Sequence, residues 1–247
     1  MPQVHLARGG DHASARTSLW FPSLGLPPAL CCLLSCRCLA VWGGLLTGLA
    51  LTASGCGSSP TDVDVDDRAP LPPVAQLDFG AVEPAEAWDY WELRWMMPPG
   101  ADSILGSGGA GARAQLPSQV QEELDALSPA TGFAQGCLPG HCFKILAGVD
   151  GDEIHLWTTV DGLLEFLGSV DSLVEAALLL DAHGFWWDEG EDTGWRSAPG
   201  GWEFVVLERV SSCAPVQTDR VRLLVAGSGE LHEQAREVWE RLEGACI

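Results

Sequence analysis

An apolar run from Cys38 to Cys56, CLAVWGGLLTGLALTASGC, divides the chain and limits what each part can form. One positive charge, Arg37, precedes the run, and small residues end it at Ser54-Gly55-Cys56. A basic flank, an apolar stretch and a small-residue end are typical of a secretory signal. A transmembrane helix needs about 20 apolar residues, and this run is shorter and rich in glycine. We therefore expect a cleaved signal rather than an uncleaved membrane anchor.

The residues that end at Cys56 resemble the lipobox of bacterial lipoproteins. The resemblance implies cleavage before Cys56, lipidation of that cysteine and attachment to the cell envelope. Gly57 is not the aspartate that retains similar lipoproteins at the inner membrane, so the expected location is the outer membrane. Residues 1–55 would then be the signal peptide, and we interpret its first part, which shows no helical or strand period, as an overextended start of the reading frame.

The chain after the signal is strongly acidic. Three of the 13 basic and one of the 34 acidic residues precede Cys56, which leaves 10 against 33 and a formal charge of −23. Such a surface repels phosphate backbones, so we expect no nucleic-acid partner. The expected partners are the membrane, through the lipid on Cys56, and an envelope polymer or protein. Lys144 is the one lysine of the chain, which we interpret as a coding bias.

Four cysteines follow the lipidation site: Cys137, Cys142, Cys213 and Cys246. An even number in an exported domain predicts two disulfide bonds, with three connectivities open. We favour Cys137–Cys142 across a tight Pro-Gly turn and Cys213–Cys246 between a strand and the C-terminus. A zinc site of Cys137, His141 and Cys142 is the alternative, but its spacing differs from the two-residue gap of structural zinc sites.

The chain between the signal and residue 133 has few regular patterns. Gly, Ser, Pro and Asp dominate its beginning, which predicts a lipidated Cys56 and a mostly disordered, flexible tether over 56–84. We interpret residues 85–132 as a linker-rich region with short helices. Within this region Trp88, Trp91 and Trp95 recur at helical spacing, which predicts one of these helices.

Two further motifs lie in this linker-rich region. GSGGAGA, from Gly106, contains the glycine spacing of a dinucleotide site, but no strand is expected before it and no helix directly after it, so we interpret it as a linker. Ser118 and Gln121 have the spacing of a capping box, which predicts a short helix that ends before Pro129.

Residues 133–247 carry the pattern of a compact α+β domain. Two apolar runs meet at Asp150-Gly151, a strong signal for a hairpin. A helix that ends at Gly168 follows, and a capping box of Ser172 and Glu175 opens a second helix that ends at Gly184.

Three strands complete the domain, over 202–210, over 221–226 and from Glu230. The tight turn Gly227-Ser228-Gly229 favours a returning strand from Glu230, where a helix is the alternative. The order ββααβββ predicts a small antiparallel sheet covered by two helices.

The run VDGLLEFLGSVDSLVEAALLLDAHG, with GGWEFVV and the last two cysteines behind it, resembles a group of uncharacterised exported bacterial proteins, often lipoproteins. The resemblance covers about residues 137–247. It implies the same order of helices, strands and cysteines, and it implies no particular activity.

The chain lacks the sequence patterns of common catalytic sites, such as G-x-S-x-G and H-E-x-x-H. We therefore expect a binding or interaction module without catalysis, cofactor or metal. The candidate ligand site is the acidic, aromatic loop 185–202. Its residues, with His183 at the edge, are Trp186, Trp187, Asp188, Glu189, Glu191, Asp192, Trp195 and Trp202.

Aromatic faces beside carboxylates would suit a sugar or a cation. Calcium binding, or an envelope-directed hydrolase that uses these acids, is the alternative function. The competing interpretation is that the tryptophans cover a sheet edge while the carboxylates stay in water.

Overall fold

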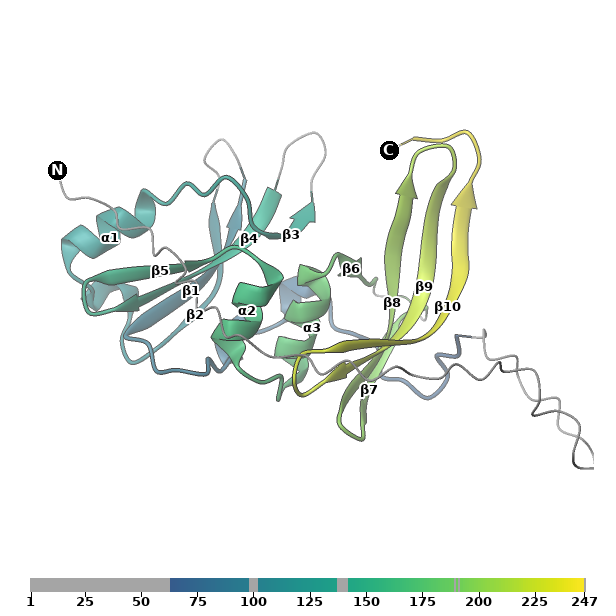
Figure 1. The fold of residues 1–247 in the computed structure, drawn as a ribbon, viewed down its shortest axis with the longest axis horizontal. Helices are drawn as coiled ribbons and strands as arrows, with labels where there is room; N and C mark the ends of the chain where they lie inside the picture. Colours follow the sequence, from purple (N-terminus) through teal and green to yellow (C-terminus); the bar gives the residue numbers. More distant parts are fainter. Residues whose placement is uncertain (1–62, 98–101, 137–141, 189, 191, 247) are drawn as a thin grey trace, which may run out of the picture. The chain divides into compact units, whose positions relative to one another are not determined.

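The computed structural model describes residues 63–97, 102–136, 142–188, 190 and 192–246, which belong to one compact unit. Two antiparallel sheets dominate this unit, and the described residues include three α-helices (Figure 1). None of the helices in the described part is both long and apolar enough to cross a bilayer. The α+β class is therefore right, with more sheet than the sequence patterns predict.

The first sheet has the strand order β2-β1-β4-β3, and β5 also pairs with β4. The strands are β1 (Tyr90–Met96), β2 (Ser103–Gly108), β3 (Phe133–Gly136), β4 (Cys142–Asp150) and β5 (Glu153–Trp157). The hairpin predicted at Asp150-Gly151 is confirmed as β4 and β5. Gly151 takes a φ of +59°, which glycine adopts at little cost.

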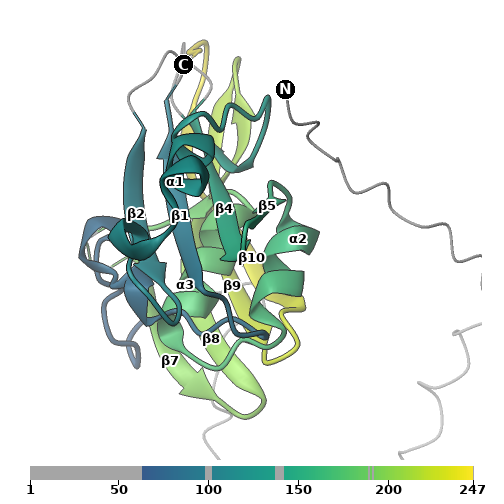
Figure 2. The same ribbon diagram turned by 90° about the vertical axis from the view of Figure 1, so that its left-hand side faces the viewer.

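The helix predicted from Trp88, Trp91 and Trp95 is wrong, because this segment forms β1 at the centre of the sheet. Tyr90 packs on α1 (Ser118–Asp125), which lies over this face of the sheet (Figure 2), whereas Trp91 joins the main core on the other face. The run Trp91-Glu92-Leu93-Arg94-Trp95 does alternate apolar and polar residues, as a strand does. Its polar members are nevertheless buried, because Arg94 donates to Glu92 and to the carbonyl oxygen of Leu124 in α1. Trp91 and Trp95 are four residues apart and share a face in a strand as well as in a helix, whereas Trp88 precedes β1.

The linker predicted at Gly106 is also wrong, because Gly106 lies within β2. A Cβ on Gly106 would lie only 2.5 Å from the Cβ of Phe79, in the short 3-10 helix η2 (Phe79–Ala81). The glycine allows the two backbones to approach each other. The region 85–132 therefore supplies two strands of the sheet, along with α1 and the 3-10 helix η3 (Arg113–Gln115).

The helix predicted at Ser118 is confirmed, but its capping box does not form. Pro117 occupies the N-cap, and Gln121 Nε2 instead donates to the carbonyl oxygen of Leu116 at 2.8 Å.

The second sheet has the strand order β10-β9-β8-β6, and β7 also pairs with β8. Its strands are β6 (Phe185–Trp186), β7 (Gly194–Ala198), β8 (Gly201–Ser212), β9 (Val216–Ala226) and β10 (Leu231–Leu242). The last three run side by side as long curved ribbons (Figure 1). The three predicted strands are thus confirmed, including the strand rather than a helix after Gly229.

Two helices connect the sheets in sequence: α2 (Val160–Leu167) and α3 (Leu173–Ala182). The capping box of α3 is confirmed, because Ser172 Oγ accepts from the Glu175 backbone and Glu175 accepts from the Ser172 backbone. One core joins both helices to Leu146 of the first sheet and Phe204 of the second. The predicted elements ββααβββ are present as β4, β5, α2, α3, β8, β9 and β10, whereas β3, β6 and β7 are additional strands within 133–247. The strands belong to two sheets, so the single small sheet is wrong.

The flexible tether predicted over 56–84 is wrong for the part that the structure describes. Val63 and Leu71 are 1% and 2% exposed, and Ala69 exchanges two backbone hydrogen bonds with Trp195 of β7. The chain then forms the 3-10 helix η1 (Val74–Gln76). Cys56 lies outside the described residues, so its lipidation stays a prediction.

Candidate functional site: an apolar cavity with a buried ion pair

A cavity of about 560 Å³ opens beside β1, β2, β3 and α3. Most of its lining is apolar and comes from segments far apart in the sequence. Its largest apolar side chains are Leu77, Phe79, Trp95, Leu105, Phe185 and Trp186. Its charged lining residues are Lys144 and Asp181. An apolar cavity of this size with few polar groups is the usual form of a small-molecule site.

Lys144 and Asp181 form an ion pair in the cavity wall, with 2.5 Å between Nζ and Oδ2. The lysine side chain is 4% exposed and that of Asp181 is 18% exposed. Burial raises the pKa of Asp181, against the opposing attraction of Lys144. Nζ also lies 4.8 Å from the ring centroid of Trp95, within the range of a cation–π contact. The pair therefore places one ammonium and one carboxylate in low-dielectric surroundings.

The secondary structure determines where the two charges lie. Lys144 is on β4, directly between Trp95 of β1 and Phe133 of β3 in the sheet register. Asp181 is in the last turn of α3, where the helix dipole disfavours a negative charge. The ammonium of Lys144 compensates for both the dipole and the burial, so each partner depends on the other.

The edge strand β3 is irregular where it borders the cavity. Its register with β4 shifts between Phe133 and Gly136. Within the shift, Ala134 has a φ of +51°, which is uncommon for a residue other than glycine, and it lines the cavity. Bulges and positive-φ residues often occur beside binding sites, because they redirect the chain.

The sequence pattern missed both charged residues of this site. The single lysine was interpreted as a coding bias, whereas the structure places it in the cavity wall. A lone lysine in an apolar stretch, CFKIL, was the available signal. Asp181 gave no signal, since one carboxylate in a helix is most often exposed.

The predicted loop 185–202 contains β6, β7 and the start of β8, and its members separate. Trp186 is 38% exposed and lines the cavity, whereas Trp187 is 8% exposed and donates from Nε1 to the carbonyl oxygen of Pro72 at 2.8 Å. Trp195 of β7 and Trp202 of β8 are diagonal neighbours in the sheet, with ring centroids 5.5 Å apart. The tryptophans therefore form no single aromatic surface.

The polar members of the predicted loop have local partners. Asp188 Oδ1 accepts from the backbone of Gly190 at 3.1 Å, and Asp192 lies 4.0 Å from Arg220 of β9. His183 caps the end of α3, and partial burial lowers its pKa although Asp161 opposes the shift. Glu189 and Glu191 lie outside the described residues.

The disulfide Cys213–Cys246 is confirmed, and it joins the end of β8 to the C-terminal segment. Cys137 and His141 lie outside the described residues, so the pairing of Cys137 with Cys142, and the zinc alternative, are not decided. Among the described residues, no cluster of three His, Cys, Asp or Glu side chains is arranged to hold a metal ion.

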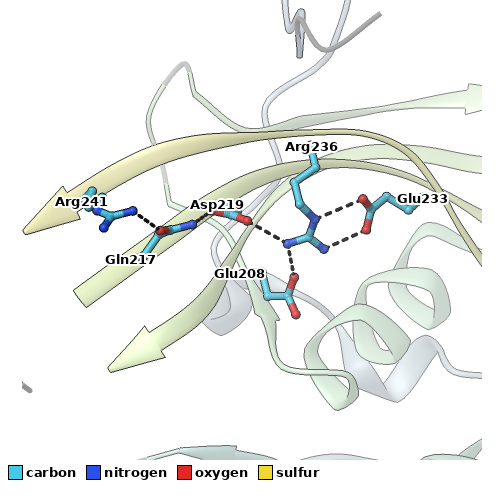
Figure 3. A network of polar contacts seen from close by, with 6 residues as sticks. All are labelled: Glu208, Gln217, Asp219, Glu233, Arg236 and Arg241. Atoms are coloured by element: carbon cyan, nitrogen blue, oxygen red, sulfur yellow. Dashed lines mark hydrogen bonds and ion pairs between the residues drawn. The ribbon is translucent and has the colours of Figure 1, made fainter. Parts of the chain in front are cut away.

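A second group of charges crosses the second sheet (Figure 3). Arg236 of β10 lies 2.7 Å from Glu208 of β8 and 3.1 Å from Asp219 of β9, and it donates twice to Glu233. The hydrogen bonds to Glu233 contribute most to the raised pKa of the Arg236 guanidinium. Because one guanidinium joins three strands, we assign this group to the register of the sheet rather than to a ligand.

The chain matches no protein-family model, no curated protein and no solved structure.

Proposed function

We propose that this chain is an extracytoplasmic binding module, without catalysis of its own, that is anchored through lipid on Cys56 and holds a small apolar ligand in the cavity. The cavity beside Lys144 carries this proposal, because its volume of about 560 Å³ falls within the ordinary range of ligand sites. The signal-like run before Cys56 and the Cys213–Cys246 disulfide support export, since disulfides persist in oxidising compartments.

Binding can be tested with a neutral apolar dye, N-phenyl-1-naphthylamine, whose fluorescence rises on transfer out of water. Leu105→Trp fills the cavity from β2 and is expected to abolish the fluorescence increase. Ile104→Trp is the matched control, because Ile104 is the neighbouring residue on β2 and is 47% exposed. Equal dye binding by both variants, or no binding by the unaltered chain, would reject the cavity as the site.

Anchorage is tested separately, by metabolic labelling with a palmitate analogue. The unaltered chain is expected to take up the label and to partition with membranes, and Cys56→Ala is expected to lose both. Label that persists in Cys56→Ala would remove the anchor from the proposal.

A further inference from the structure

The two charged groups that line the cavity, Lys144 and Asp181, do not use all of their hydrogen-bond donors and acceptors on each other. Lys144 Nζ has three hydrogens, and within the described residues its hydrogen-bond partner is Asp181 Oδ2, at 2.5 Å. The other oxygen, Oδ1, accepts no hydrogen bond from the part of the chain that the structure describes. Two donor hydrogens of Nζ and one acceptor oxygen, Oδ1, are therefore available beside an apolar cavity.

The charges of this pair are already balanced. An anionic ligand would leave the cavity with one uncompensated negative charge, and a cationic ligand would leave one positive charge. Both are costly where the surrounding side chains are apolar. The burial of Asp181, which raises its pKa, likewise disfavours a further negative charge at this position.

We infer that the ligand is a neutral amphiphile whose head group both donates and accepts a hydrogen bond, as an alcohol or a primary amide does. The head lies at Lys144 and Asp181, where it accepts from Nζ and donates to the carboxylate. The apolar body lies against Phe79, Leu105 and Trp186. This inference rests on the proposed function, because it names the ligand class for the same cavity.

The test is displacement of bound N-phenyl-1-naphthylamine from the full chain at pH 8 by probes with the same ten-carbon body. The probes are 1-decanol, decyl methyl ether, decanoate and decylammonium. The alcohol satisfies both polar partners, the ether can only accept, and the two ions disturb the charge balance. We expect 1-decanol to bind at least about tenfold more tightly than each of the other three.

The double variant Lys144→Met, Asp181→Leu keeps an apolar wall of similar volume and removes both polar groups. It is expected to bind the dye still, and to bind 1-decanol and the ether with affinities within about twofold, since the hydrogen-bonding difference is gone. If this variant still binds 1-decanol tenfold more tightly than the ether, the head group does not lie at Lys144 and Asp181.

The outcomes separate this inference from the proposed function. If the dye binds and decanoate, decylammonium or the ether equals or exceeds 1-decanol, the ligand class is wrong and the binding cavity stands. If neither the dye nor any probe binds the unaltered chain, the proposed function fails and the ligand class fails with it.

Discussion

Lys144 of β4 and Asp181 of α3 meet at 2.5 Å and join the first sheet to a buried helix. The contact brings together residues 37 positions apart, and neither charge has a second partner of opposite sign in the described part of the chain. The pair thus holds α3 against the first sheet and also supplies the charged groups of the cavity wall.

Removing one member of this pair should destabilise the fold more than removing both. Lys144→Met leaves a carboxylate buried without its counter-charge, and we expect a loss of about 3 kcal/mol in the free energy of unfolding. The double variant Lys144→Met, Asp181→Leu should lose less, because no charge remains buried. Urea unfolding measures both values, and a larger loss in the double variant would contradict this account.

The stability should depend on the protonation of Asp181. Burial raises its pKa above the ordinary 3.8, so the folded chain holds this proton at a pH where the unfolded chain has lost it. The stabilising contribution is present below pH 3.8 and is lost as the pH rises through the raised pKa. Asp181→Asn should therefore show a smaller fall in the free energy of unfolding across this window. The measurement is the difference in the free energy of unfolding between the unaltered chain and the variant from pH 3 to 6. A difference that stays constant from pH 3 to 6 would contradict the prediction.

Gly106 should tolerate no side chain, since β2 passes directly over η2 there. Gly106→Ala puts a methyl group 2.5 Å from Phe79 Cβ and 2.6 Å from its carbonyl carbon, and should cost about 2–3 kcal/mol. Gly111→Ala is the control, because its nearest contact is the flexible end of Gln115 at 3.0 Å. It should change the stability by no more than about 0.5 kcal/mol. Equal thermal stability of the two variants would reject the close approach.

Trp187 should hold the segment before η1 in place through its hydrogen bond to Pro72. Trp187→Phe removes the Nε1 donor and leaves the carbonyl oxygen of Pro72 without this hydrogen bond. The change should lower the free energy of unfolding by about 1–2 kcal/mol. Trypsin cleavage after Arg68 should become faster in this variant, because the segment opens more often. Trp186→Phe, at an exposed position, serves as the control, and equal cleavage rates in the two variants would argue against this anchoring.

The disulfide Cys213–Cys246 should stabilise the second sheet. It links residues 33 positions apart, and loop closure over that separation corresponds to about 3–4 kcal/mol. The double variant Cys213→Ser, Cys246→Ser should lose about this amount, with a lower Tm by calorimetry. A reducing agent should have a similar effect on the unaltered chain, and an unchanged Tm in the double variant would contradict the prediction.

Local patterns were sufficient for the elements whose signals lie in a few neighbouring residues. Ser172 and Glu175 predicted the start of α3, Asp150-Gly151 predicted the β4–β5 hairpin, and Gly227-Ser228-Gly229 favoured the strand β10 over a helix. In each case the determining interaction is a cap or a turn, which depends on short-range geometry.

The patterns failed where burial came from distant segments. β1 is covered on both faces, and its polar residues Glu92 and Arg94 are buried, although they alternate with apolar residues as in a half-exposed strand. The segment from Val63 to Leu71 has a polar composition, yet Val63 packs on the second sheet and Leu71 joins the main core. Within the predicted ligand loop, Trp186 lines the cavity, whereas Trp187, which follows the end of β6, is buried and donates to the carbonyl oxygen of Pro72 in a segment 115 positions earlier.

The sequence alone determined the acidic charge, the signal-like run before Cys56, the α+β class, and the helices and hairpin that local residues specify. Only the tertiary structure decided that the strands form two sheets, and that Lys144 and Asp181 share an apolar cavity. The physical reason is the range of the interactions. Caps and turns are completed within a few residues, whereas a cavity and a buried ion pair exist only after distant segments have packed together.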